Sequence, residues 1–217
     1  MFLEPFQSQD VMSFAPTPTP SQDSPPPLQS QPLQNTSPPS IQSDPRTADV
    51  SLDSTYQNSS FGFKMNYPSD WSVQEIDYDP SDPITDIVTF TSPFESPQDT
   101  FTENLIVSSQ KISDNSMTAE KFADEVFSIL PDAQLVDKNT TTINISGNDY
   151  PAYTLVYSQD IIDDEYPRVI SAEKGIIVDD MAYIFQYPGN DQSTFPVYLP
   201  IVQQMIDSFE LTSPTGN

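Results

Sequence analysis

The sequence predicts an α+β fold, an α/β/α sandwich with a central, mainly antiparallel sheet, preceded by a disordered N-terminal tail. Strand-like alternation of large apolar and polar residues starts at Phe61 and recurs along the chain. Two segments with helical spacing of apolar residues interrupt it, one near the middle and one near the C-terminus. Strands that follow one another in this way pair antiparallel, so we expect about six to eight strands with helices on the faces.

The tail is set apart by its prolines. Of the 23 prolines, eleven precede Tyr56, and this part of the chain has almost no aliphatic periodicity. It cannot bury enough apolar surface to offset the entropy of ordering its backbone. We therefore predict a disordered, partly polyproline spacer over residues 1–54, one domain over residues 55–212 and a frayed C-terminus over residues 213–217.

The first half of the domain is expected to hold four strands and a helix. Phe61 to Gln74 should form a hairpin around the turn Pro68-Ser69-Asp70, and strands follow at Ile84–Thr91 and Asn104–Lys111. Thr118 can cap a helix that Pro131 ends. The apolar face of this helix would be formed by Phe122, Val126, Ile129 and Leu130.

The second half is expected to hold four strands and a closing helix. The strands are Gln134–Ile145, Tyr150–Ser158, Val169–Val178 and Met181–Tyr187, with hairpin turns at Gly147-Asn148-Asp149 and at Val178-Asp179-Asp180-Met181. The helix would bury Phe195, Leu199, Val202, Met205, Ile206 and Phe209 and expose Gln203, Gln204 and Asp207. The chain has no βαβαβ alternation and no G-x-G-x-x-G, which argues against a dinucleotide-binding fold.

Charge limits the classes of partner. The formal net charge is -25, with 32 acidic and 7 basic side chains. Six acids and Arg46 lie in the tail, which leaves 26 acidic and six basic residues in the domain, a net charge of -20. Such a surface repels phosphate backbones and anionic lipid headgroups, so neither nucleic acid nor an anionic membrane is the expected partner. A protein partner is expected instead, and the simplest reading of the charge is a highly soluble surface.

Two residue types are missing. The chain has no Cys, which excludes disulfides, thiolate nucleophiles, Cys-ligated zinc and a lipobox anchor. It also has no His, which excludes Ser-His-Asp and Cys-His catalysis and histidine-metal sites. We expect no enzyme activity, no cofactor and no catalytic, cofactor-binding or metal-binding residues.

Several groups of residues offer alternatives to this expectation. Paired carboxylates for glycoside hydrolysis could come from Asp163, Asp164 and Glu165. Oxygen ligands for calcium could come from Asp77, Asp79 and Asp82, or from Asp160 to Glu165. Trp71 and the Tyr and Phe residues could line a groove, but their alternation favours a sheet core. The tail prolines lack flanking basic residues, which favours a spacer over an SH3-type ligand.

Four segments resemble PsbP-type domains. Phe61–Trp71 resembles the opening hairpin of that family, Tyr198–Phe209 its last helix and Ala182–Tyr187 the strand that precedes this helix, while Met117–Glu120 lies where the family has its first helix. The resemblance covers about Tyr56 to Leu211 and none of the tail.

This resemblance implies an α–β–α sandwich in a usually exported or lumenal protein. The founding members are extrinsic subunits of the photosystem II oxygen-evolving complex that influence its calcium and chloride, and a nuclear relative binds the GTPase Ran. The plant proteins have a basic N-terminal docking segment, whereas the segment here carries Arg46 alone. Prokaryotic PsbP-related proteins with a Pro/Ser/Thr spacer look like cell-surface proteins of unknown function.

Compartment stays open between two alternatives. Residues Met1–Phe14 lack a basic n-region and a continuous apolar h-region, so they do not read as a signal peptide. Either the protein is soluble where it is made, or an export segment precedes this start. Sequons at Asn35, Asn58, Asn139 and Asn144 are compatible with export.

Function is expected to be that of an accessory or binding domain, exported or at the cell surface. The alternative is a calcium-binding or small-molecule-binding domain that uses the groove between helix and sheet. A calcium titration followed by Trp71 fluorescence separates the two.

Overall fold

The computed structural model describes residues 50–77, 84–94, 96–97, 101–114, 116–160, 168–189 and 195–212. Every described residue belongs to one compact unit within Gln42–Asn217. Most of the expected spacer and the whole expected C-terminal segment, residues 213–217, lie outside the described residues. Both assignments stay predictions.

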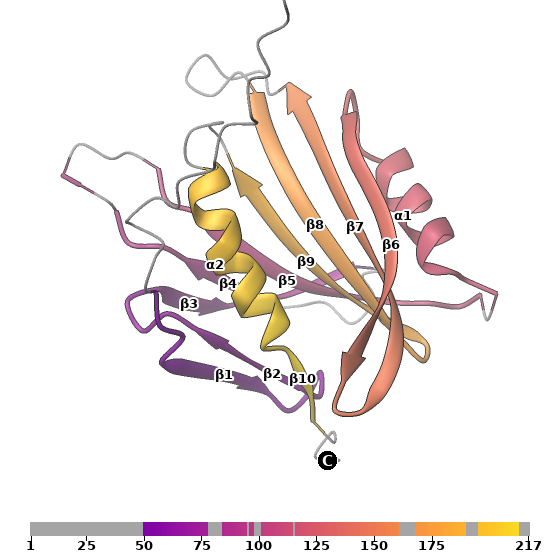
Figure 1. Cartoon of the computed structure of the whole chain (residues 1–217), viewed down its shortest axis with the longest axis horizontal. Helices are drawn as coiled ribbons and strands as arrows, with labels where there is room; N and C mark the ends of the chain where they lie inside the picture. The colour runs from indigo at the N-terminus through magenta and orange to yellow at the C-terminus, as the bar shows by residue number, and fades with distance from the viewer. Residues whose placement is uncertain are drawn as a thin grey trace, which may run out of the picture. The chain divides into compact units, whose positions relative to one another are not determined.

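A seven-stranded antiparallel sheet forms the centre of the domain (Figure 1). The strands are, in spatial order, β3 (Ser72–Glu75), β4 (Ile84–Thr91), β5 (Asn104–Lys111), β9 (Met181–Gly189), β8 (Arg168–Val178), β7 (Asn148–Asp160) and β6 (Gln134–Ile145). Consecutive strands β6 to β9 form a meander, whereas β9 returns to pair with β5. The last expected strand is therefore a central strand of the sheet.

A second, three-stranded sheet is formed by β1 (Ser54–Asn58), β2 (Phe63–Tyr67) and β10 (Glu210–Leu211). It brings the two ends of the domain together, because β10 pairs with β2 through Glu210↔Lys64 and Leu211↔Phe63. Val50 and Leu52, which precede β1, are half-buried against the core. The expected sequence elements did not include β1 or β10.

Two helices cover opposite faces of the large sheet, which confirms the α+β sandwich (Figure 1). Helix α2 (Phe195–Asp207) belongs to the core cluster that contains Phe185 and Tyr187 of β9, together with the small sheet. Helix α1 (Ala119–Ser128) belongs to the cluster on the other face, with Tyr153 of β7. Because side chains alternate along a strand, neighbouring residues of β7 and β9 supply the two cores.

The expected hairpin from Phe61 to Gln74 is wrong. A tight turn is present, with the Trp71 amide donating to the Pro68 carbonyl at 3.0 Å. The strands on either side nevertheless diverge: β2 pairs with β1 and β10, whereas β3 pairs with β4. The turn therefore carries the chain from one sheet into the other, and both strands find their hydrogen-bond partners elsewhere.

Three smaller expectations also need correction. The hairpin turn after β6 is Ser146-Gly147, both at positive φ, so Asn148 and Asp149 already belong to β7. Helix α1 ends at Ser128, and Ile129 is its exposed C-cap instead of part of the buried face. Phe209 follows α2, which ends at Asp207, but its side chain is buried.

A group of aromatic residues packs in the core that α2 and the two sheets share. The Phe209 ring lies 5.5 Å from Phe63 and 5.2 Å from both Tyr183 and Phe185, measured between ring centroids. Trp71 is also buried, beside Tyr198. The preference for a sheet core over a ligand groove is confirmed for Trp71.

Candidate functional site

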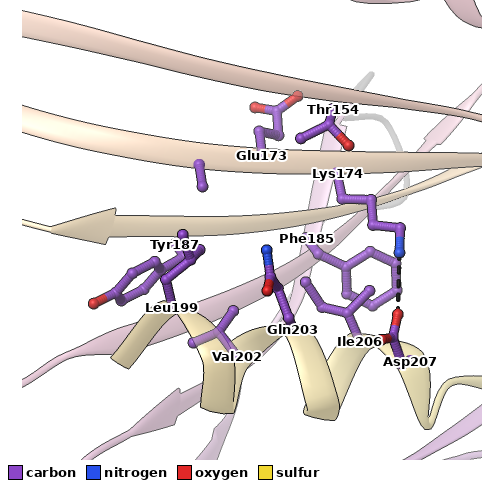
Figure 2. A pocket seen from close by; sticks show the side chains of 11 residues that line it. Thr154, Glu173, Lys174, Phe185, Tyr187, Leu199, Val202, Gln203, Ile206 and Asp207 are labelled. Carbon is purple, nitrogen blue, oxygen red and sulfur yellow. Dashed lines mark hydrogen bonds and ion pairs between the residues drawn. The ribbon is translucent and has the colours of Figure 1, made fainter. Parts of the chain in front are cut away.

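A groove between α2 and the strands β7, β8 and β9 combines apolar and polar walls (Figure 2). Its volume is about 260 Å³. The walls are formed by Thr154, Ala172, Glu173, Lys174, Phe185, Tyr187, Leu199, Val202, Gln203, Ile206 and Asp207. Small-molecule sites of proteins start at about 300 Å³, so the groove fits a small ligand or one or two side chains of a partner.

The floor of the groove is apolar and fixed. Phe185 and Tyr187 are fully buried residues of β9 that face α2. Tyr187 stacks on Phe195 at the start of α2, with ring centroids 5.2 Å apart, and its hydroxyl donates to the Phe195 carbonyl at 3.5 Å. Burial raises the pKa of Tyr187, so this hydroxyl stays protonated. Tyr187 therefore holds the first turn of α2 at its place on the sheet.

The mouth of the groove is polar. Lys174 on β8 and Asp207 at the end of α2 form an ion pair, with 3.3 Å between Nζ and Oδ1 (Figure 2). Gln203, one turn earlier on α2, is exposed beside it. A second cavity of about 70 Å³, lined by Ile143, Asn144, Ile145 and Phe209 among others, shares Lys174 and Asp207 with the first. The ion pair thus lies between two neighbouring hollows along one side of α2.

Position in the fold explains why these side chains meet. Lys174 alternates with apolar residues on the α2 face of β8, where Ala172 and Ile176 belong to the core. Asp207 lies on the polar side of α2, which follows from the helical spacing of its apolar residues. The helical spacing predicts Asp207 and Gln203 on an exposed helix face, but no sequence pattern indicates Lys174, which is 33 residues away from Asp207 along the chain.

Glu173 is the most unusual titratable group on the opposite face. Its side chain points away from α2 in Figure 2, and only 4% of the residue is exposed. The Tyr153 hydroxyl donates to Glu173 Oε1 at 2.6 Å. Burial raises the pKa of Glu173, while the hydrogen bond from Tyr153 opposes this shift. Perturbed carboxyls often mark active sites, but an acid catalyst must reach its substrate, and this one is sealed under α1.

The Tyr153 ring packs directly against the backbone of β8 at Gly175. A Cβ at Gly175 would overlap the Tyr153 ring, so only glycine leaves room for the ring at this position. On its other side Tyr153 packs against Phe122 of α1, with ring centroids 5.8 Å apart. Burial raises the pKa of Tyr153 far above its ordinary value, with the Glu173 charge as the next cause. The hydroxyl therefore stays protonated as the donor to Glu173.

The acidic candidates of the sequence analysis are only partly described. Asp79 and Asp82, and also Asp163, Asp164 and Glu165, lie outside the described residues. Asp160 is exposed and lies 3.8 Å from the Arg168 guanidinium. Asp77 lines a polar pocket of about 380 Å³ together with Glu75 and Asn58. The parts of the chain that the structure describes contain no group of three or more carboxylates placed to hold a metal ion.

The candidate sequons differ in accessibility. Asn139 and Asn144 are exposed on β6, whereas Asn58 is half-buried and its Oδ1 accepts from the amides of Ser60 and Phe61. Asn35 lies outside the described residues. Glycosylation stays a prediction.

Comparisons with known proteins bear on the fold. No protein-family model and no curated protein sequence matches the chain. The structure is similar to cyanobacterial PsbP from Synechocystis sp. PCC 6803, with a TM-score of 0.50 and 16% identity over 73% of this chain and 91% of that one. It thus has a PsbP-like fold, as the four sequence segments indicated.

Two further solved structures give lower scores. The Ran-binding protein Mog1p of Saccharomyces cerevisiae has a TM-score of 0.48 and 12% identity over 73% of this chain and 94% of its own. LpqN of Mycobacterium tuberculosis, described as involved in cell envelope biogenesis, has a TM-score of 0.45 and 15% identity over 69% of this chain and 83% of its own. Among the described residues, no helix is long and apolar enough to cross a membrane.

Proposed function

We propose that the chain is a non-catalytic binding domain that takes an apolar group of a partner into the groove under α2. The observation that carries this proposal is the groove itself, whose apolar walls include the half-buried Ala172 and Leu199 and whose mouth holds an ion pair and an amide. Sites of this composition bind through the apolar floor and orient the ligand through a few polar groups. The absence of His and Cys, and the sealed position of Glu173, support a role without catalysis.

We further propose that the domain works outside the cytoplasm, exported or at a cell surface, at the end of the N-terminal spacer. The proline-rich composition of residues 1–54 and the exposed sequons on β6 support this placement. The excess of acidic over basic residues disfavours nucleic acid and anionic membranes, so a protein partner is the first candidate for the ligand.

Anilinonaphthalene sulfonate tests the groove, because it joins an apolar ring system to an anion that can approach Lys174. We expect saturable binding, seen as a rise in dye fluorescence. Gln203→Phe places a larger side chain at the mouth and should abolish most of this signal. Gln204→Phe is the matched control, since Gln204 is exposed on the same helix but does not line the groove.

Two results would contradict the proposal. One is the absence of saturable dye binding to the parent chain. The other is equal loss of binding in the two variants, because that would show a general effect on α2 instead of an effect on the groove. Circular dichroism of both variants establishes that α2 and the sheets are intact.

A further inference from the structure

The outer edge of β6 is long and without a partner strand among the described residues. β6 spans twelve residues at the end of the large sheet and pairs with β7 alone. The opposite edge strand, β3, has four residues. An exposed edge presents a row of free N–H and C=O groups that can accept another strand, and natural proteins usually shorten or blunt such edges.

The turn after β6 tells which backbone groups face outward. Ser146 and Gly147 have φ of 53° and 90°, a two-residue turn that closes on the hydrogen-bonded pair Ile145↔Asn148. Because bonded and non-bonded pairs alternate along an antiparallel ladder, Asn144, Thr142 and Thr140 direct their N–H and C=O groups away from β7. Pro151 lies opposite Thr142 and has no N–H group. This agrees with the alternation, because a residue of β7 at a non-bonded pair donates no hydrogen bond to β6.

The sequence of this edge favours strand pairing. Residues 139–145, Asn-Thr-Thr-Thr-Ile-Asn-Ile, contain no charge, no Gly and no Pro, and five of the seven are Thr or Ile. Such β-branched residues pack well on a pleated surface. The features that blunt an edge, a bulge between Leu135 and Asp137 and the charges of Asp137 and Lys138, lie in the first half of the strand.

A pocket beside the β6 edge, called the notch below, contains the negative charge of Glu120. It has a volume of about 380 Å³ and is lined by Thr118, the N-cap of α1, by Ala119 and Glu120 of α1, and by the three threonines 140–142 of β6. Glu120 is its single charged wall residue and is exposed. The nearby Lys138 ammonium is already paired with Asp124 at 2.6 Å, which raises the pKa of Lys138. The notch therefore presents net negative charge.

We propose that the β6 edge binds an extended segment of another protein by β-strand addition, and that this segment carries a Lys or Arg that pairs with Glu120. The backbone of the segment bonds to Thr140, Thr142 and Asn144, and its basic side chain enters the notch. Charge selects the occupant: a second copy of this domain would bring another net charge of -20 to the same edge, whereas a basic segment is attracted. This surface does not depend on the groove under α2.

The test uses the full chain and a capped ten-residue peptide that alternates Val and Lys. Two control peptides carry Glu in place of Lys, or N-methyl groups on alternate amides, which keep the charge but block strand pairing. Amide hydrogen exchange by NMR is the readout. We expect the Val/Lys peptide to slow exchange at Thr140, Thr142 and Asn144, and both control peptides to fail.

Two protein variants separate backbone pairing from charge. Thr142→Pro removes one outward N–H without touching the β6–β7 ladder and should abolish binding, while Thr142→Val, the matched control, should retain it. Glu120→Gln should weaken binding about two- to fivefold, the range of an exposed ion pair.

Four results would overturn the proposal. They are unchanged exchange at millimolar Val/Lys peptide, equal binding of the N-methylated peptide, equal binding of the Glu peptide, and equal binding by the Thr142→Pro and Thr142→Val variants. Sedimentation of the protein alone adds a fifth, because a dimer that Thr142→Pro dissociates would make a second copy the occupant.

Discussion

At the scale of single residues, the most informative group is the buried pair of Glu173 and Tyr153. A carboxyl is rarely buried without a partner, and here the Tyr153 hydroxyl supplies the hydrogen bond that makes burial tolerable. The glycine at position 175 leaves the space that the Tyr153 ring occupies. These three positions therefore form one unit, although nothing in the sequence marks them as related.

The raised pKa of Glu173 makes stability depend on pH. Between the ordinary carboxyl pKa and the raised value, the folded chain holds a proton that the unfolded chain has released. The free energy of unfolding contributed by this group therefore falls as pH rises through that window. We expect Glu173→Gln, which cannot titrate, to become more stable relative to the parent as pH rises from 4 to 8.

Urea unfolding of both chains across this pH range measures the effect. The readout is how the difference in unfolding free energy between variant and parent changes with pH. A cost of the introduced amide that is the same at every pH shifts this difference by a constant and leaves its trend unchanged. Glu125→Gln, on an exposed position of α1, is the control and should show no comparable trend. A difference for Glu173→Gln that stays constant with pH would contradict the raised pKa.

At the scale of elements, sequence periodicity located most helices and strands well. β4, β5 and β6 have the expected bounds, because their alternation is long and bordered by turn or loop residues. β1 and β10 were missed. β10 has two residues, too few for a period, and β1 buries only Tyr56 among its five residues.

The start of α1 is an element whose energetics can be tested. Thr118 Oγ1 accepts from the Lys121 amide at 3.2 Å, which satisfies one of the free N–H groups of the first turn. Thr118→Ala should lower the free energy of unfolding by about 1 kcal/mol. Thr118→Ser keeps the hydroxyl and should stay close to the parent, with urea midpoints as the measurement. Equal losses in both variants would show that the cap is not the cause.

Pairing between elements could not be read from the sequence. Pro68-Ser69-Asp70 is a turn, as expected, but a turn fixes only the reversal of the chain and not the partners of the strands beside it. β2 finds better partners in β1 and β10, which lie at the two ends of the domain. Such pairings depend on how distant segments pack, and the periodicity of a single segment does not predict them.

At the scale of the whole molecule, charge and the spacer are the properties that the sequence expresses most directly. The domain carries a net charge of -20 and the spacer, with six acids and Arg46, the remaining -5 of the total of -25. We propose that residues before β1 contribute to stability only where they reach the core, at Val50 and Leu52.

Two shortened chains test this boundary. A chain that starts at Asp49 should unfold at the same urea concentration as the full chain. A chain that starts at Tyr56 loses Val50, Leu52 and the first pairs of β1, and should be less stable by about 2 kcal/mol, the cost of exposing roughly one buried aliphatic side chain. Equal midpoints for the two shortened chains would mean that residues 50–55 add nothing to the fold.

The sequence by itself determined the class of the fold, the positions of both helices and most strands, the acidic surface and the absence of histidine and cysteine chemistry. These follow from local periodicity and composition, which each segment carries in its own residues. Only the tertiary structure decided that Phe61 to Gln74 divides between two sheets, that Lys174 meets Asp207 across a groove, and that β6 pairs with β7 alone among the described strands. The physical reason is that strand order and cavities arise from contacts between segments far apart in the chain, which compete for partners once the whole core packs.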